Sequence, residues 1–253
     1  MNNDNHALVP TVLHEDDDVV VIDKPHGMLV HEDGFASHAG TVVAWLLERA
    51  PQAQGVGEVT LTPKGVAIER SGVVHRLDRD TSGVMVLAKT ADAHIHLKAQ
   101  FHDRLVKKEY RALVYGKVND KWGTIDRPIG RSAKDFRLRT AGQGARGTLR
   151  DAVTHYECLN AGEYKEENFS YLALKPKTGR THQLRVHLKA IDRPIVGDVL
   201  YARHKLSQSN NLGLNRLALH AYQLELVLPN GKEAVFTAPL PTDFKEALQR
   251  IAI

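Results

Sequence analysis

The chain has 253 residues, of which 42% are hydrophobic and 25% charged, a composition that predicts a globular fold with an ordinary core. No run of about 18 apolar residues occurs, so we expect no transmembrane helix. The N-terminus lacks the basic and apolar segments of a secretory signal. The single cysteine, Cys158, excludes an intrachain disulfide. These features favour a cytoplasmic protein without a membrane partner.

The net charge of +4 is distributed unevenly along the chain. Residues 1–23 contain six acidic and no basic residues, so the rest of the chain holds 34 bases against 24 acids. Six bases lie between Arg131 and Arg150, and eight lie between Lys175 and Lys205. Such clusters can bind a polyanion, although a solvated basic face without a partner has the same composition.

The apolar pattern predicts the following elements in the first half of the chain. Residues 1–14 are expected to form a flexible polar arm, and Val19–Ile22 a buried strand. Residues 41–50 predict a short helix that ends at a proline, and residues 51–72 predict a loop. Gly83–Ala88 predicts a strand.

Further along, Thr90 can cap a helix that runs to about Leu105, and Glu109–Val118 returns as a strand. The polar, glycine-rich stretch 119–150 predicts strand fragments joined by loops. The remaining predicted elements are strands at 151–159, 169–175, 217–228 and 234–238 and helices at 181–191 and 242–251. Asn230-Gly231 is a strong hairpin signal. Together these elements predict one α+β domain over residues 15–253, with a mixed, mostly antiparallel sheet flanked by helices and loops.

The segment His75–Gly83, HRLDRDTSG, concentrates charged side chains beside a predicted buried strand. Five of its nine residues are ionisable or carry an imidazole. A loop that leads directly into a buried strand is a usual place for catalytic residues. From these residues alone, a solvated turn in which Asp78 or Asp80 caps neighbouring N–H groups is an equally good interpretation.

Two other segments could carry chemistry. In Lys175–Arg185, KPKTGRTHQLR, a glycine turn opens a helix, and its N–H groups could form an anion site with Lys175, Lys177 and Arg180. A basic helix start held by local hydrogen bonds is the alternative. Tyr110 lies in a predicted strand among cations, where a tyrosine is usually part of the core.

Several other chemistries lack their sequence patterns. The chain has 14 histidines, but His94 and His96 point to different faces of a helix, and no HExxH or Cys/His ligand set occurs. Gly-x-Ser-x-Gly is also absent, and no Gly-x-Gly-x-x-Gly dinucleotide loop that joins a strand to a helix is predicted. We therefore predict no metal and no cofactor. A phosphate-ester hydrolase would fit the basic turn, but the metal or activated nucleophile that it needs is not found.

HRLDRDTSG resembles the signature of the RluA family of pseudouridine synthases. Three further segments resemble family motifs and follow in the family's order: Asp23–His31 (DKPHGMLVH), Lys108–Val114 (KEYRALV), and Gly179–Arg185 (GRTHQLR) with Pro194–Asp198 (PIVGD). The resemblance covers about residues 15–240. Asp23 stands where the family often has asparagine, outside the catalytic set.

The resemblance implies an enzyme that detaches a uracil base in RNA, rotates it, and rejoins it to the sugar through carbon 5 without a metal or cofactor. It implies that Asp78 is the catalytic carboxylate, that Arg180 pairs with it, and that Tyr110 packs on the target base. The base must be flipped out of the RNA, and Arg76 would fill the gap. Further RNA contacts are expected from His75, Arg79, Thr81, Lys108, Lys175, Lys177, His182 and Arg185.

Many relatives carry an extra RNA-binding domain ahead of the catalytic domain, whereas here the matching region begins within about fifteen residues of Met1. We therefore expect the catalytic domain itself to bind the RNA, with the segment Arg131–Arg150 as one contact. Ribosomal RNA is the favoured substrate, transfer RNA is open, and a monomer is expected. A non-catalytic RNA-binding protein with the same fold is the alternative.

Overall fold

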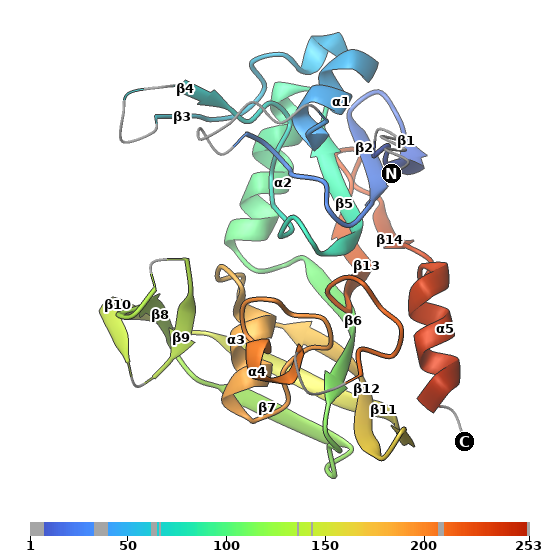
Figure 1. Ribbon diagram of the computed structural model, residues 1–253. Helices are drawn as coiled ribbons and strands as arrows, with labels where there is room; N and C mark the ends of the chain where they lie inside the picture. The colour runs from blue at the N-terminus through green and yellow to red at the C-terminus, as the bar shows by residue number, and fades with distance from the viewer. Residues whose placement is uncertain are drawn as a thin grey trace, which may run out of the picture. The chain divides into compact units, whose positions relative to one another are not determined.

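The computed structural model describes residues 8–32, 40–61, 65, 67–135, 137–142, 144–206 and 210–251 (Figure 1). The chain forms two compact units. The first comprises Met1–Val106 with Gln223–Ala238, and the second comprises Lys107–Tyr222 with Pro239–Ile253. Strand β13 (Leu219–Val227) contributes its first residues to the second unit and its last residues to the first. That residues 15–253 act as one catalytic domain stays a prediction.

The first unit is built on antiparallel strands. Its elements are β1 (Thr11–Glu15), β2 (Val19–Lys24), α1 (Val42–Arg49), the 3-10 helix η1 (Pro51–Ala53), β3 (Val59–Leu61), β4 (Ala67–Glu69), β5 (Ser82–Ala88), α2 (Ala91–His102) and β14 (Glu233–Thr237). Strand β2 pairs with β1 and with β5, and β14 pairs with β13. Every residue of β5 is buried, as its apolar run predicted. Both predicted helices form, and Thr41 and Thr90 cap them as N-caps.

Two sequence predictions in the first unit differ from the structure. Residues 11–14 were assigned to a flexible arm, but Thr11–Glu15 forms β1 against β2, whose backbone groups it pairs. Residues 1–7 lie outside the described residues. The stretch 51–72 was predicted as a loop, yet Val59–Leu61 pairs with Ala67–Glu69 as the antiparallel ribbon β3–β4. These strands have three residues each, too few to give a visible alternation.

The second unit contains longer antiparallel strands, ordered β6-β12-β11-β7, and a separate three-stranded sheet, ordered β10-β8-β9. Its elements are β6 (Lys107–Tyr115), β7 (Trp122–Asp126), β8 (Ile129–Ser132), β9 (Arg139–Ala141), β10 (Ala145–Arg150), β11 (Val153–Tyr164), β12 (Glu167–Pro176), α3 (Gln183–Ala190), α4 (Arg203–Leu206) and α5 (Thr242–Ile251). The antiparallel pairing confirms the predicted α+β class. In the described ranges, no helix is both long and apolar enough to span a bilayer.

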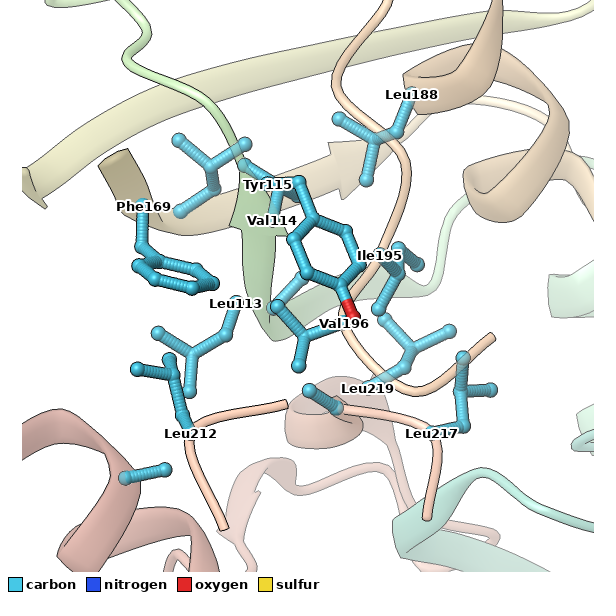
Figure 2. Packing of buried hydrophobic residues seen from close by; sticks show 14 of the residues in the cluster. Leu113, Val114, Tyr115, Phe169, Leu188, Ile195, Val196, Leu212, Leu217 and Leu219 are labelled. Atoms are coloured by element: carbon cyan, nitrogen blue, oxygen red, sulfur yellow. The ribbon is translucent and has the colours of Figure 1, made fainter. Parts of the chain in front are cut away.

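The core of the second unit fixes the position of α3. Figure 2 shows the Tyr115 ring of β6 among aliphatic side chains, with Leu188 of α3 in the same cluster. The centroids of the Tyr115 and Phe169 rings are 5.7 Å apart. Because Leu188 is fully buried in this cluster, α3 cannot move without opening the core. The turn that precedes α3, which the sequence analysis singled out, is therefore held in place at one end.

Candidate active site

The loop that carries Asp78 is closed by backbone hydrogen bonds. Thr81 N donates to Asp78 O over 3.1 Å, which folds the loop just before β5. Gly27 N donates to Arg79 O over 2.8 Å and so joins the loop to the turn after β2. Gly27 has φ +83°, a left-handed conformation that favours glycine. The loop is therefore tied to the ends of two buried strands.

Lys24, the last residue of β2, strengthens this connection. Its side chain is fully buried, and its Nζ donates to Pro25 O and Met28 O, each over 2.8 Å, and to Arg79 O over 3.0 Å. An ammonium group has three N–H donors, and here each has a carbonyl acceptor. Lys24 therefore holds the turn after β2 and the Asp78 loop together.

Burial is the main influence on the charge of Lys24. It lowers the pKa of this amine to about 7, while the nearby carboxylates of Asp80, Asp78 and Asp23 act in the opposite direction. The sequence analysis did not single out this lysine. The available signal was its position at the end of the apolar run VVVI, where a charged side chain needs a buried partner.

The structure gives two of the predicted RNA contacts a supporting role in this loop. The His75 ring stacks on Phe101 with centroids 4.4 Å apart, and its Nε2 accepts a hydrogen bond from Val86 N over 3.1 Å. Thr81 is only 2% exposed. The buried Thr81 side chain cannot reach RNA in this conformation, which corrects that expectation, whereas the half-buried His75 stays a candidate RNA contact. Arg76 and Arg79 are exposed and stay candidates for RNA binding.

In the second unit, Gln183 organises the turn between β12 and α3. Its Oε1 accepts from Thr178 Oγ1 over 2.7 Å and from Arg180 N over 3.0 Å. Its Nε2 donates to Val153 O and Thr154 Oγ1, each over 3.0 Å. Both amide hydrogens and the carbonyl oxygen of this buried side chain are thus hydrogen-bonded. No sequence pattern indicates this role, since the partners of Gln183 come from β11 and the turn.

Arg180 and Tyr110 both belong to the second unit, whereas Asp78 belongs to the first. Arg180 is half-buried, and its Nε donates to Asp151 O over 3.1 Å. Tyr110 is half-buried on β6 opposite Leu174 of β12. The pairing of Arg180 with Asp78 stays a prediction.

Arg185 and His182 were also predicted to contact RNA, and the structure gives them internal partners. The Arg185 guanidinium forms two hydrogen bonds with Asp198, of 2.7 and 2.8 Å, and the side chains are 5% and 0% exposed. His182, with φ +55°, has its Nδ1 2.9 Å from Tyr201 Oη. A buried cation in a bidentate pair cannot reach RNA in this conformation, so the expectation for Arg185 is corrected.

The three predicted lysine contacts are accessible to different degrees. Lys175 is exposed and lies 3.3 Å from Glu109 Oε2. Lys177 is exposed, and Lys108 is half-buried on β6. These residues remain candidate phosphate contacts of the second unit.

A row of arginines crosses the three-stranded sheet. Arg131 of β8 is paired with Arg139 of β9 on one side and with Arg146 of β10 on the other. Residues directly opposite in antiparallel strands point to the same face, and like charges there repel. In the part of the chain that is described, no ion pair is found for Arg131 or Arg146. This row, which lies in the predicted Arg131–Arg150 contact, is suited to a polyanion.

No cluster of three His, Cys, Asp or Glu side chains that could hold a metal ion is found within the described ranges. The sites described above therefore consist of one carboxylate loop in the first unit, and a turn and an arginine row in the second. Each is held by hydrogen bonds and packing within its own unit.

Comparison with known proteins identifies the class to which these sites belong. The family model for RNA pseudouridylate synthase matches residues 18–190. A ribosomal large subunit pseudouridine synthase D from Nitrosomonas europaea is 39% identical over 99% of this chain and 68% of its own length. An uncharacterized RNA pseudouridine synthase from Synechocystis is 38% identical over 94% of this chain and 67% of its own length. A solved structure, human RNA pseudouridylate synthase domain containing 1, has a TM-score of 0.72 and 26% identity, covering 94% of this chain and 86% of that one.

The chain therefore belongs to the RNA pseudouridine synthases, enzymes that isomerise uridine in RNA to pseudouridine. Within them, it belongs to the RluA type whose motifs its sequence resembles. Both the expected family and the expected enzyme class are confirmed.

Proposed function

We propose that this enzyme acts as a cytoplasmic monomer on a specific uridine of ribosomal RNA, with Asp78 as its catalytic carboxylate and without a metal or cofactor. The observation that carries the role of Asp78 is the fixation of its loop by Lys24 and Gly27 at the ends of buried strands. A catalytic group must be held in a productive position, and rigid elements provide this. The ribosomal substrate is inferred from the names of relatives 36–40% identical to this chain.

The proposed reaction begins when the target uridine leaves the RNA stack, which costs a few kcal/mol. With Asp78 at the sugar or the base, the bond between N1 and C1′ breaks and a bond between C5 and C1′ forms. The proton on C5 is released, and N1 gains one. Arg180 would hold the carboxylate through two hydrogen bonds, and Tyr110 would pack on the base.

The basic side chains would bind the RNA backbone. Arg131, Arg139 and Arg146 form one row, while Arg79, Lys108, Lys175 and Lys177 are candidates nearer the motifs. Arg76, exposed in the Asp78 loop, would occupy the space that the flipped base leaves. Binding through phosphate contacts predicts an affinity that falls steeply with salt.

Release of tritium from carbon-5-labelled uridine tests this proposal, because forming the new carbon–carbon bond expels that hydrogen. The purified protein is incubated with separate ribosomal and transfer RNA transcripts. Asp78→Asn keeps the shape of the side chain but removes its charge, so we expect turnover to fall at least about 10³-fold while RNA binding persists. Arg180→Met, measured in parallel, should be severely impaired, whereas Arg180→Lys should retain part of the rate.

Release from ribosomal RNA alone would support the whole proposal, and release from transfer RNA alone would change its substrate. Full activity of Asp78→Asn would remove Asp78 as the catalyst. Near-normal rates for Arg180→Met would refute its pairing with Asp78. Binding without release on every RNA tested would favour the alternative of a non-catalytic RNA-binding protein.

A further inference from the structure

The first unit contains a pocket that the proposed reaction does not use. Its volume is about 230 Å³, and it lies between the segment that follows β2, the end of β4 and the Asp78 loop. Three arginines line it: Arg70, Arg76 and Arg79. Its apolar walls include Leu29, Ile68 and Leu77.

The pocket shares the Asp78 loop but is distinct from the carboxylate. Leu77 and Arg79 line it, whereas Asp78 between them does not. Because Asp78 is not among the lining residues while Leu77 and Arg79 are, a ligand in the pocket would lie beside the position of the reacting uridine rather than in it.

Arg70 has an unusual environment in this pocket. Its Nε is enclosed by protein and has no hydrogen-bond partner in the described structure. A buried donor without an acceptor costs free energy of folding, so such a group needs another explanation. An anion in the pocket would offset part of this cost by stabilising the charge of the guanidinium, although Nε itself is closed to a ligand.

The lining indicates the chemistry of that ligand. The lining residues include three arginines and one acidic residue, Glu32, so the charge of the lining favours an anion. Guanidinium groups bind phosphate through paired hydrogen bonds and stack on nucleobases. The apolar walls would contact a base, which inorganic phosphate lacks. The volume is below the roughly 300–1,000 Å³ of pockets for larger ligands and suits a single nucleotide.

We propose that this pocket receives one nucleotide of the RNA, adjacent in the chain to the uridine that Asp78 modifies, with its phosphate bound by Arg70. The proposal rests on the proposed function for the identity of the RNA. It makes Arg70 a binding residue that helps to select the sequence or shape around the target.

The test compares Arg70→Met with Arg49→Met, an exposed arginine of α1 that forms an ion pair with Glu15 and does not line the pocket. Each change is made in the active protein and in the Asp78→Asn background. The active proteins give kcat and KM for tritium release from the transcript that the unaltered enzyme modifies. The Asp78→Asn proteins give Kd for the same RNA at several salt concentrations. Tm is measured for all of them.

We expect Arg70→Met to raise KM and Kd roughly tenfold and to reduce the salt slope of Kd by about one, while Arg49→Met changes neither. Because Arg70→Met removes a buried unpaired donor, its Tm should not fall below that of the unaltered protein. A lower Tm with unchanged Kd would make Arg70 a structural residue and overturn the proposal.

Ile68→Trp provides a second test, because it fills the pocket without changing the charge. It should raise Kd and leave the salt slope unchanged; an unchanged Kd would overturn the proposal even if Arg70→Met fails to fold.

Uridine 5′-monophosphate is tested as a free ligand. Tight binding that Arg70→Met abolishes, with no effect of that change on the Kd for RNA, would indicate a mononucleotide site instead. If no RNA supports turnover, the proposed function fails, but the Kd comparison still decides on the pocket.

Discussion

The two units hold their functional segments with buried cations of different kinds. In the first unit, Lys24 donates to three backbone carbonyls, which carry no formal charge. In the second unit, Arg185 is neutralised by Asp198 in a bidentate pair next to the turn that bears Arg180. An arginine keeps its charge at any ordinary pH, whereas burial lowers the pKa of Lys24 to about 7.

A buried cation can therefore hold a functional segment in a way that is independent of pH, as an arginine does, or sensitive to pH, as Lys24 is. Lys24 can lose a proton near neutrality, and a neutral amine has two N–H donors for three carbonyls. The hold on the Asp78 loop should therefore depend more strongly on pH than the hold on the turn that bears Arg180.

The largest expected effect comes from breaking the ion pair of the second unit. Arg185→Met leaves Asp198 buried without its cation, and we expect the free energy of unfolding to fall by about 3–5 kcal/mol. Urea denaturation measures this. Arg185→Met combined with Asp198→Asn should recover part of the loss, because the charge is then absent. A loss below about 1 kcal/mol for the single change would mean that the pair does not hold this region.

A smaller effect is expected in the first unit. Lys24→Met removes the donor from three buried carbonyls but also removes the cost of burying a charge, so we expect a loss of about 2–3 kcal/mol at pH 7. Because Arg79 O loses one of its two donors and keeps only Gly27 N, the loop is held less firmly, and kcat should fall more than KM rises. If the fully folded variant had the same kcat as the unaltered enzyme, Lys24 would not position the loop.

The two cations also differ in the pH dependence of their contributions to stability. Lys24 has a pKa of about 7 when folded and 10.5 as its ordinary value, so between these values the unfolded state binds more protons. The pH-dependent part of the Lys24 contribution to stability is then fully present above about pH 10.5 and is lost as the pH falls toward 7. The unfolding free energy of the unaltered protein, minus that of Lys24→Met, should rise over this interval. If the unfolding free energies of the unaltered protein and of Lys24→Met changed with pH in parallel, the lowered pKa of Lys24 would be contradicted. The corresponding difference for Arg185→Met should not change over this interval.

Much of the fold followed from local sequence patterns. The apolar runs of β2 and β5, the caps Thr41 and Thr90, and the Asn230-Gly231 turn have causes that lie within a few residues. The three-residue strands β3 and β4 and the edge strand β1 were missed, because their pairing depends on residues distant in the chain.

The motifs identified the segments that carry the candidate site, but they did not reveal what each side chain in those segments contacts. Thr81 and Arg185 lie within motifs that suggested RNA contact, yet both side chains are buried, and Arg185 is paired with Asp198. Charge in a sequence does not reveal burial, and the partners of Arg185 and Lys24 are known only once the fold is known. The arginine row became visible only through the register of three strands.

That row links the effect of salt on folding to its effect on binding. In the free protein, Arg131 lies between Arg139 and Arg146, and their repulsion weakens the small sheet. Dissolved ions screen this repulsion, so moderate salt should make the free sheet harder to open. In the proposed RNA complex, the same ions would compete with these arginines for the phosphates. Through the same three side chains, added salt would then stabilise the small sheet and weaken the proposed binding of RNA.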